Sequence, residues 1–129
     1  MNDSGNLRSD RPASKLWDGC YDEASFTQEC TAGNANISSF FVNFDFGQSY
    51  NLTKARLFGD ADGVWVSNTW DLQTRNSTSD AWTTVFSGAN AFMNDWSEKS
   101  ISVTARYARV TVKGNPSGAG TQAREFELF

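Results

Sequence analysis

The stretch "FFVNFDFG", residues 40–47, predicts the fold more directly than any other part of the chain. Successive side chains of a β-strand point to opposite faces, so regular alternation of apolar and polar residues is typical of a half-buried strand. Gly47 is expected to end the strand. One face carries Phe40, Val42, Phe44 and Phe46, and the other carries Phe41, Asn43 and Asp45.

The same period of two recurs along most of the chain, in short segments separated by Gly, Asn, Asp and Ser. Seven or eight short strands with such turns are typical of an all-β fold, an antiparallel β-sandwich or jelly roll. The longest loops are expected at 18–39, 59–68, 75–81, 88–98 and 114–123, and function on a rigid sandwich usually lies in such loops. The further strands are expected at 52–58, 69–75, 82–88, 100–105, 106–114 and 124–129.

Length and composition set limits on the function. The chain has 129 residues, which fits one domain, and we expect residues 1–12 to be a linker or arm and residues 13–129 a single module. The net charge of −4 argues against nucleic-acid binding, which needs a basic surface. No apolar run is long enough for membrane insertion. We expect a monomer excised from a longer, exported protein.

Catalytic motifs are missing from the sequence. Histidine is absent, which removes the commonest general base and the commonest zinc ligand. No nucleophile elbow, phosphate-binding glycine loop or HExxH pattern occurs, although a pair of catalytic carboxylates stays open. We therefore expect a binding module and not an enzyme.

The two cysteines, Cys20 and Cys30, lie in the acidic segment "KLWDGCYDEASFTQEC", residues 15–30. Nine residues separate them, too many for a CxxC redox or zinc motif. In an exported protein a local disulfide is the simpler interpretation and would contribute roughly 2.5–3 kcal/mol in the chain-entropy model. In a cytosolic protein two free thiols would be expected.

Five segments, in this order, resemble one known family. They are "KLWDG", "VNFDFGQ", "WDLQTRNSTSDAWTTVFSG", "ARYARVTVKGN" and "REFELF", and together they extend over roughly residues 13–129. The chain resembles the family 32 carbohydrate-binding modules, which have a discoidin-like β-sandwich fold. Within that family it looks most like modules attached to marine polysaccharide lyases, particularly alginate lyases.

The resemblance implies one structural calcium ion, Ca2+, that ties the first ordered loop to the last strand. Calcium accepts six to eight oxygen ligands of mixed type, which suits this set. The alternative is that Asp18 only starts a turn and that the acidic residues form a solvated rim. The ligands carried over from the family are the carbonyl of Lys15, the carboxylate of Asp18, the carbonyl of Cys20, the hydroxyl of Ser25, the carbonyl of Arg124 and the carboxylate of Glu125.

The resemblance also places a sugar site on the loop at residues 59–68, with the loops 31–38 and 114–123 beside it. Sugar recognition needs an exposed aromatic ring and a few fixed polar groups. We expect Trp65 to be the stacking platform and Asn68 the hydrogen-bonding residue. Further candidates for sugar contact are Asp60, Asn115 and Arg124.

The other tryptophans are assigned by their position in the pattern. Trp70 and Trp82 lie on predicted strands and are expected in the core. Trp17 is expected to pack beside the turn at Asp18 that would bind the calcium ion. Trp96 lies in a predicted loop and is the alternative sugar platform.

Together these observations favour a secreted bacterial carbohydrate-binding module that tethers a glycan-degrading enzyme, a glycoside hydrolase or polysaccharide lyase, to its polysaccharide. A cell-surface lectin or adhesion domain would be favoured if the parent chain lacked a catalytic domain. A purely structural sandwich would be favoured if no aromatic residue were exposed at the loop end.

If Cys20 and Cys30 form a disulfide, thiol titration of the unfolded, unreduced protein should find no free sulfhydryl group. Titration after reduction should find two thiols per chain and serves as the control. Two thiols before reduction would show that the cysteines are not paired.

Overall fold

The structure is a computed structural model that describes residues 2–17, 32–35, 37–59, 61–62, 65–114 and 120–129. Within these residues the chain is built almost entirely of strands, in the order β1 to β9, with one short 3-10 helix, η1. No helix in the described part of the chain is long and apolar enough to cross a membrane. The predicted all-β class is confirmed.

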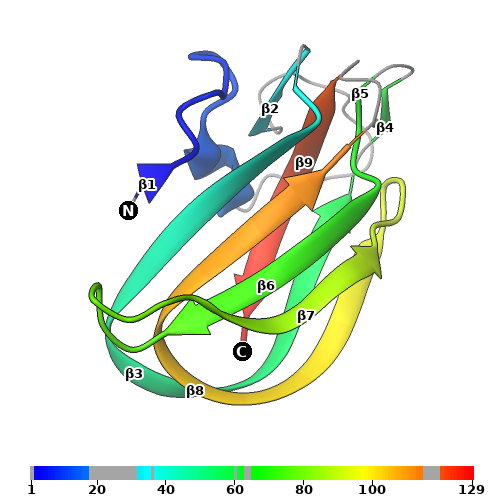
Figure 1. The fold of residues 1–129 in the computed structure, drawn as a ribbon. Helices are drawn as coiled ribbons and strands as arrows, with labels where there is room; N and C mark the ends of the chain where they lie inside the picture. The colour runs from blue at the N-terminus through cyan, green and yellow to red at the C-terminus, as the bar shows by residue number, and fades with distance from the viewer. Residues whose placement is uncertain (1, 18–31, 36, 60, 63–64, 115–119) are drawn as a thin grey trace.

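Two long strands form the centre of the fold. β3 (Ser39–Gly59) and β8 (Trp96–Lys113) pair antiparallel from Ser39 opposite Lys113 to Phe58 opposite Trp96. Both strands bend together at the lower end of the molecule (Figure 1). Because of this bend, the two halves of each strand belong to two different layers.

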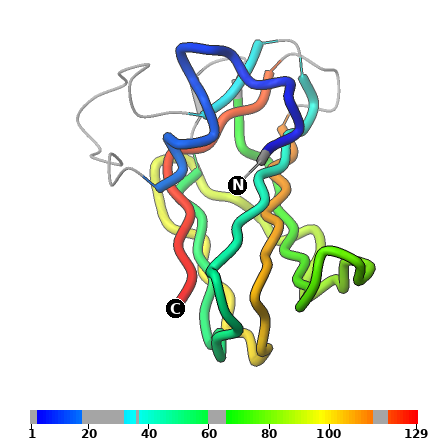
Figure 2. The backbone as a smooth tube through the Cα atoms, turned by 90° about the vertical axis from the view of Figure 1, so that its left-hand side faces the viewer, coloured from blue at the N-terminus to red at the C-terminus, as the bar shows by residue number. Residues whose placement is uncertain are grey.

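The other strands extend one layer or the other. β9 (Thr121–Leu128) pairs with the second half of β3, from Ala55 opposite Leu128. β6 (Thr69–Arg75) pairs with the second half of β8, and β7 (Thr83–Asn90) then pairs with β6. Figure 2 shows β9 and the β6–β7 hairpin on opposite sides of the bent pair. The predicted antiparallel sandwich is confirmed.

Short elements complete the end of the sandwich that lies opposite the bend. β2 (Ala32–Asn34) pairs with β9, β4 (Ala61–Asp62) pairs with β5 (Trp65–Val66), and β5 meets β9 in parallel at Val66 and Thr121. η1 (Ala13–Leu16) places Ala13 and Leu16 in the core. These elements bring several chain segments together at the upper end of Figure 1.

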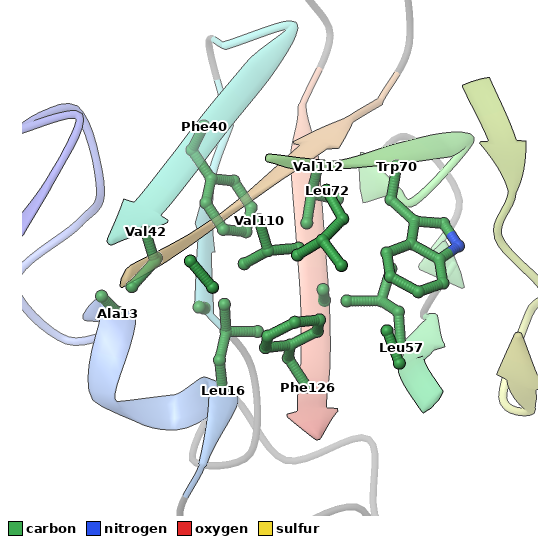
Figure 3. Packing of buried hydrophobic residues seen from close by; sticks show 14 of the residues in the cluster. Ala13, Leu16, Phe40, Val42, Leu57, Trp70, Leu72, Val110, Val112 and Phe126 are labelled. Atoms are coloured by element: carbon green, nitrogen blue, oxygen red, sulfur yellow. The ribbon is translucent and has the colours of Figure 1, made fainter. Parts of the chain in front are cut away.

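The core lies between the two layers (Figure 3). Its largest side chain is Trp70, which is fully buried. The Trp70 ring packs edge-on against Phe86 at 4.8 Å and against Phe126 at 6.1 Å between centroids. Its Nε1 donates to the hydroxyl of Ser97 at 3.0 Å, so the polar atom of the indole is satisfied inside the core.

Gly47 does not end the first predicted strand. The strand continues to Gly59 through register shifts between Asp45 and Tyr50 and between Leu52 and Lys54. Gly47 has φ of 82°, a conformation that glycine adopts without steric cost, and its N–H donates to the Asp45 carboxylate at 2.8 Å. The glycine therefore marks a bulge that bends the strand, which is why two predicted strands are one.

The N-terminal segment, for which we expected a linker or arm over residues 1–12, is held against the sandwich. β1 (Asn2–Asp3) pairs with β3 at Asn43 and Val42. Arg11 is buried and its Nη1 donates to the side chain of Gln122 in β9 at 3.2 Å. Its polar composition predicted exposure, but backbone pairing and one buried arginine order this segment.

The packing predicts that Trp70 and Trp82, both expected in the core from the sequence, contribute very differently to the free energy of unfolding. Trp70→Ala should lower the free energy of unfolding by about 3–5 kcal/mol because it leaves a cavity between the layers. Trp82→Ala should cost much less, because Trp82 is half-buried on the outer face. Chemical denaturation measures both values, and an equal or reversed order would contradict this packing.

Candidate functional site

A polar hollow of about 310 Å³ opens beside Asn68. Its lining comes from three strand ends, those of β3, β8 and β6, and from the residues next to them. We call it the Asn68 hollow, and it is lined by Ser38, Ser39, Asn68, Thr69, Lys113 and Gly114. All of these except glycine carry a polar side chain, so the described lining offers hydrogen bonds to a ligand.

The backbone of Asn68 is fixed on both sides. Its N–H donates to the carbonyl of Lys113 at 2.7 Å, and its carbonyl accepts from the N–H of Ala91 at 2.9 Å. The side chain is exposed, and within the described residues it makes no hydrogen bond. A ligand can therefore meet an amide whose backbone needs no further ordering, which lowers the entropy cost of binding.

Gly114 allows the surrounding segments to approach closely. Its N–H donates to the carbonyl of Ser38 at 2.8 Å. A Cβ atom at this position would lie 2.6 Å from the carbonyl oxygen of Gly120 and 2.7 Å from that of Val66. Because three backbones meet here, only glycine fits without displacement of one of them.

Lys113 contributes a positive charge that is already paired. Its Nζ lies 2.8 Å from the carboxylate of Asp71. Burial would raise the pKa of Asp71, but hydrogen bonds from Lys113 and from the N–H of Gly88 outweigh it and lower the pKa. Asp71 therefore stays ionised at neutral pH, and the Asn68 hollow has little net charge.

The predicted sugar residues have different outcomes. Asn68 lines the hollow, and the backbone of Trp65 lies in β5, paired with Asp62. The side chain of Trp65 and the residues Asp60 and Asn115 lie outside the described part of the chain. Arg124 is fully buried, so it does not present its side chain to a sugar, and that part of the prediction is wrong.

The predicted calcium ligands lie partly outside the described residues. Lys15 is in η1, and Arg124 and Glu125 are in β9, which packs against η1. Glu125 is only 3% exposed, although the alternation of β9 directs it away from Phe126 and the core. Asp18, Cys20 and Ser25, with Cys30 of the predicted disulfide, lie outside the described residues.

The structure shows where the other predicted tryptophans, Trp70, Trp82 and Trp96, lie. Trp70 is in the core as predicted, but Trp82 is half-buried on the outer face, where Arg75 and Arg109 lie over its ring. Trp82 is the residue directly before β7, so the alternation of that strand does not fix its direction. Trp96, the alternative platform, is half-buried beneath Arg56 and against Phe58.

Sequence reasoning missed most of the hollow's lining. Ser38, Ser39, Thr69 and Lys113 are ordinary strand-end residues with no motif of their own. Only the strand register, which aligns Thr69 with Lys113 and Lys113 with Ser39, brings them together.

Comparison with known proteins shows which solved structures share this fold. No protein-family model matches the chain, and no curated protein matches it. Solved structures do match over nearly the whole length. Chitosan-binding module 1, derived from a chitosanase/glucanase of Paenibacillus sp. IK-5, has a TM-score of 0.73 at 20% identity, over 99% of this chain and 92% of that one.

Two further matches were solved with bound ligands. The CBM32 domain of AlyQ, in complex with 4,5-unsaturated mannuronic acid, has a TM-score of 0.72 at 20% identity, over 100% of this chain and 94% of that one. The Clostridium perfringens domain CpGH89CBM32-5, in complex with GalNAc-β-1,3-galactose, has a TM-score of 0.74 at 14% identity, over 99% and 92%. The chain therefore has the discoidin-like fold of family 32 carbohydrate-binding modules, and the predicted resemblance is confirmed for the fold.

Proposed function

We propose that this chain is a non-catalytic carbohydrate-binding module of the family 32 type, and that the Asn68 hollow is its saccharide site. The observation that carries the proposal is the Asn68 amide, which is exposed on a backbone held by two hydrogen bonds. Serine and threonine hydroxyls beside it match the hydroxyl edges of a sugar. Sugar-bound neighbours of the same fold support this assignment.

We further propose that the module is secreted by a bacterium and is fused, as a monomer, to a glycan-degrading enzyme that it tethers to a polysaccharide. The related module derived from a chitosanase/glucanase supports the fusion. The AlyQ domain supports the narrower likeness to alginate lyase modules. An open hollow of this size buries little ligand area, so a single site should bind with modest affinity.

Asn68→Ala should weaken saccharide binding tenfold or more, since losing about 1.4 kcal/mol is a factor of ten. A glycan array of the whole chain identifies the saccharide, and titration of that saccharide then compares the variant with the unchanged protein. Stability should change little, because the side chain is exposed.

Asn51→Ala is the matched control for that measurement. Asn51 is also exposed, but it lies near the bend and accepts a hydrogen bond from Thr104. Equal binding by the Asn68 variant and the unchanged chain would refute the site, and no saccharide bound on the array would refute the function.

We also propose the structural calcium ion. Glu125 supports it, because a buried carboxylate next to the segment that holds Lys15 is the type of oxygen donor that calcium prefers. When bound, the ion would link η1 and the following segment to β9 and neutralise the carboxylate of Glu125. Lys15, Asp18, Cys20, Ser25, Arg124 and Glu125 would hold it.

Calcium should raise the melting temperature of the protein and a chelator should lower it, because a ligand that binds only the folded state stabilises that state. Glu125→Gln should abolish this calcium-dependent shift, whatever its own stability. Glu127→Gln removes the same charge two residues away, where Arg56 pairs with it, and should keep the shift. A calcium response that survives Glu125→Gln would refute the assignment.

A further inference from the structure

A second hollow, of about 200 Å³, lies on the outer face of the sandwich near the bend. Its residues come from β3, β8, β6 and the β6–β7 connection. We call it the Arg75 hollow, and it is lined by Asn43, Phe44, Asp45, Arg75, Thr78, Trp82 and Tyr107. Its described lining combines aromatic rings with charged groups.

Two arginines share one indole ring here. The guanidinium carbon of Arg75 lies 4.2 Å from the ring centroid of Trp82, and that of Arg109 lies 4.6 Å from it. Arg109 also lies 4.2 Å from the Phe41 ring, and Arg75 lies 5.6 Å from the Tyr107 ring. Stacking uses the flat face of a guanidinium and leaves N–H groups at its edge for other partners.

Neither guanidinium has a carboxylate partner among the described residues. Arg109 donates from Nε to the amide oxygen of Asn43 at 2.7 Å, and Arg75 donates from Nη1 to the carbonyls of Thr78 and Asp80 at 3.3 Å. The Nε of Arg75 is buried and makes no hydrogen bond within the described part of the chain. Burial and the charge of Arg75 lower the pKa of Arg109.

The other arginines of the outer surface differ in this respect. Arg8, Arg56 and Arg106 form ion pairs with Asp10, Glu127 and Asp45 respectively. Two adjacent positive charges without a carboxylate are therefore a local exception in a chain of net charge −4. An anion beside them would offset their mutual repulsion, and a carboxylate matches the geometry of a guanidinium edge.

We propose that the Arg75 hollow binds the carboxylate of a uronic acid unit in an acidic saccharide. The proposal rests on the saccharide-binding function proposed above and names a second contact and a substrate class. Arg75 lines the hollow and would hold the carboxylate, and Arg109, which lies beside the hollow against the same Trp82 ring, would add its positive charge. Tyr107 and Trp82 would border the apolar face of the sugar ring.

Asp45 lines the same hollow, but its negative charge is already balanced by an ion pair with Arg106. Two hydrogen bonds from Arg106, at 2.8 and 3.0 Å, and one from the N–H of Gly47 lower its pKa to about 2. It is therefore ionised and paired at neutral pH. It reduces the attraction of the hollow for an anion without filling the edges of Arg75 and Arg109.

The two hollows lie at opposite ends of the segment in which β3, β8 and β6 run beside one another. Thr69, Lys113 and Ser39 are aligned at one end, and six residues along each strand the register aligns Arg75, Tyr107 and Asp45. An even number of residues places both sets on one face, roughly 20 Å apart at about 3.3 Å per residue. One extended saccharide chain along this face would therefore reach both hollows.

The test compares acidic and neutral forms of one saccharide. The whole chain is titrated with an oligomannuronate, with an oligogalacturonate and with the carboxyl-reduced form of each. At least one uronate should bind more tightly than its reduced form. Added salt should lower the affinity for the uronate and leave the affinity for the reduced form unchanged. No uronate preference in either pair overturns the proposal.

Single substitutions test which residues cause the preference for a uronate over its reduced form. Arg75→Gln and Arg109→Gln should each lower uronate affinity about tenfold and leave the reduced form within about twofold, a tenfold loss being about 1.4 kcal/mol. Asp45→Asn removes a negative charge, keeps an acceptor for Gly47 and should strengthen uronate binding. Arg8→Gln gives the same charge change at a distant ion pair and should have no effect.

The outcomes separate the two proposals. If Asn68→Ala abolishes binding of the reduced form and the Arg75 and Arg109 variants leave uronate binding unchanged, the proposed function stands and the Arg75 hollow is refuted. If only the arginine variants act, the Arg75 hollow stands and the Asn68 site fails. Displacement of the uronate by an equal concentration of inorganic phosphate would show a general anion site and overturn the proposal. A gain of uronate affinity in Asp45→Asn supports it even if an arginine variant fails to fold.

Discussion

The pairing of β3 with β8 is the constraint on which the rest of the structure depends. These strands share one register from the Ser39–Lys113 pair to the bend and belong to both layers of the sandwich. β9 and the β6–β7 hairpin each attach to one layer through this pair. The pairing is interrupted at the bulge around Gly47 and resumes at Tyr50, so the two strands stay paired on both sides of the bend.

The same register creates the surface that carries both candidate sites. Alternation along β3, β6 and β8 sends one set of side chains into the core and the opposite set to a single outer face. The Asn68 hollow and the Arg75 hollow lie at the two ends of that face. The rigid sheet therefore fixes their separation, so that one polymeric ligand can be contacted twice without reorganisation of the protein, which favours binding by reducing the entropy that is lost.

Charge placement gives the two hollows different chemistry. At the Asn68 hollow the basic group in the described lining, Lys113, is paired with Asp71. At the Arg75 hollow, Arg75 and Arg109 share the Trp82 ring and have no described carboxylate partner. Neutral hydroxyl recognition suits the first and carboxylate recognition suits the second, because a guanidinium edge binds a carboxylate through two parallel hydrogen bonds.

The sequence by itself determined the main strand segments, most of their buried faces and the all-β class, because period-two alternation is a local property of the backbone. The resemblance made Asn68 a candidate, and the position of Trp70 within a strand pattern predicted its burial. Only the tertiary structure decided the bend at Gly47, the half-buried position of Trp82 on the outer face and the burial of Arg124 and Glu125. These features depend on which strand lies beside which and in what register. Local alternation directs Glu125 away from the core, but burial on that side depends on segments distant in sequence that pack there, and no local pattern encodes them.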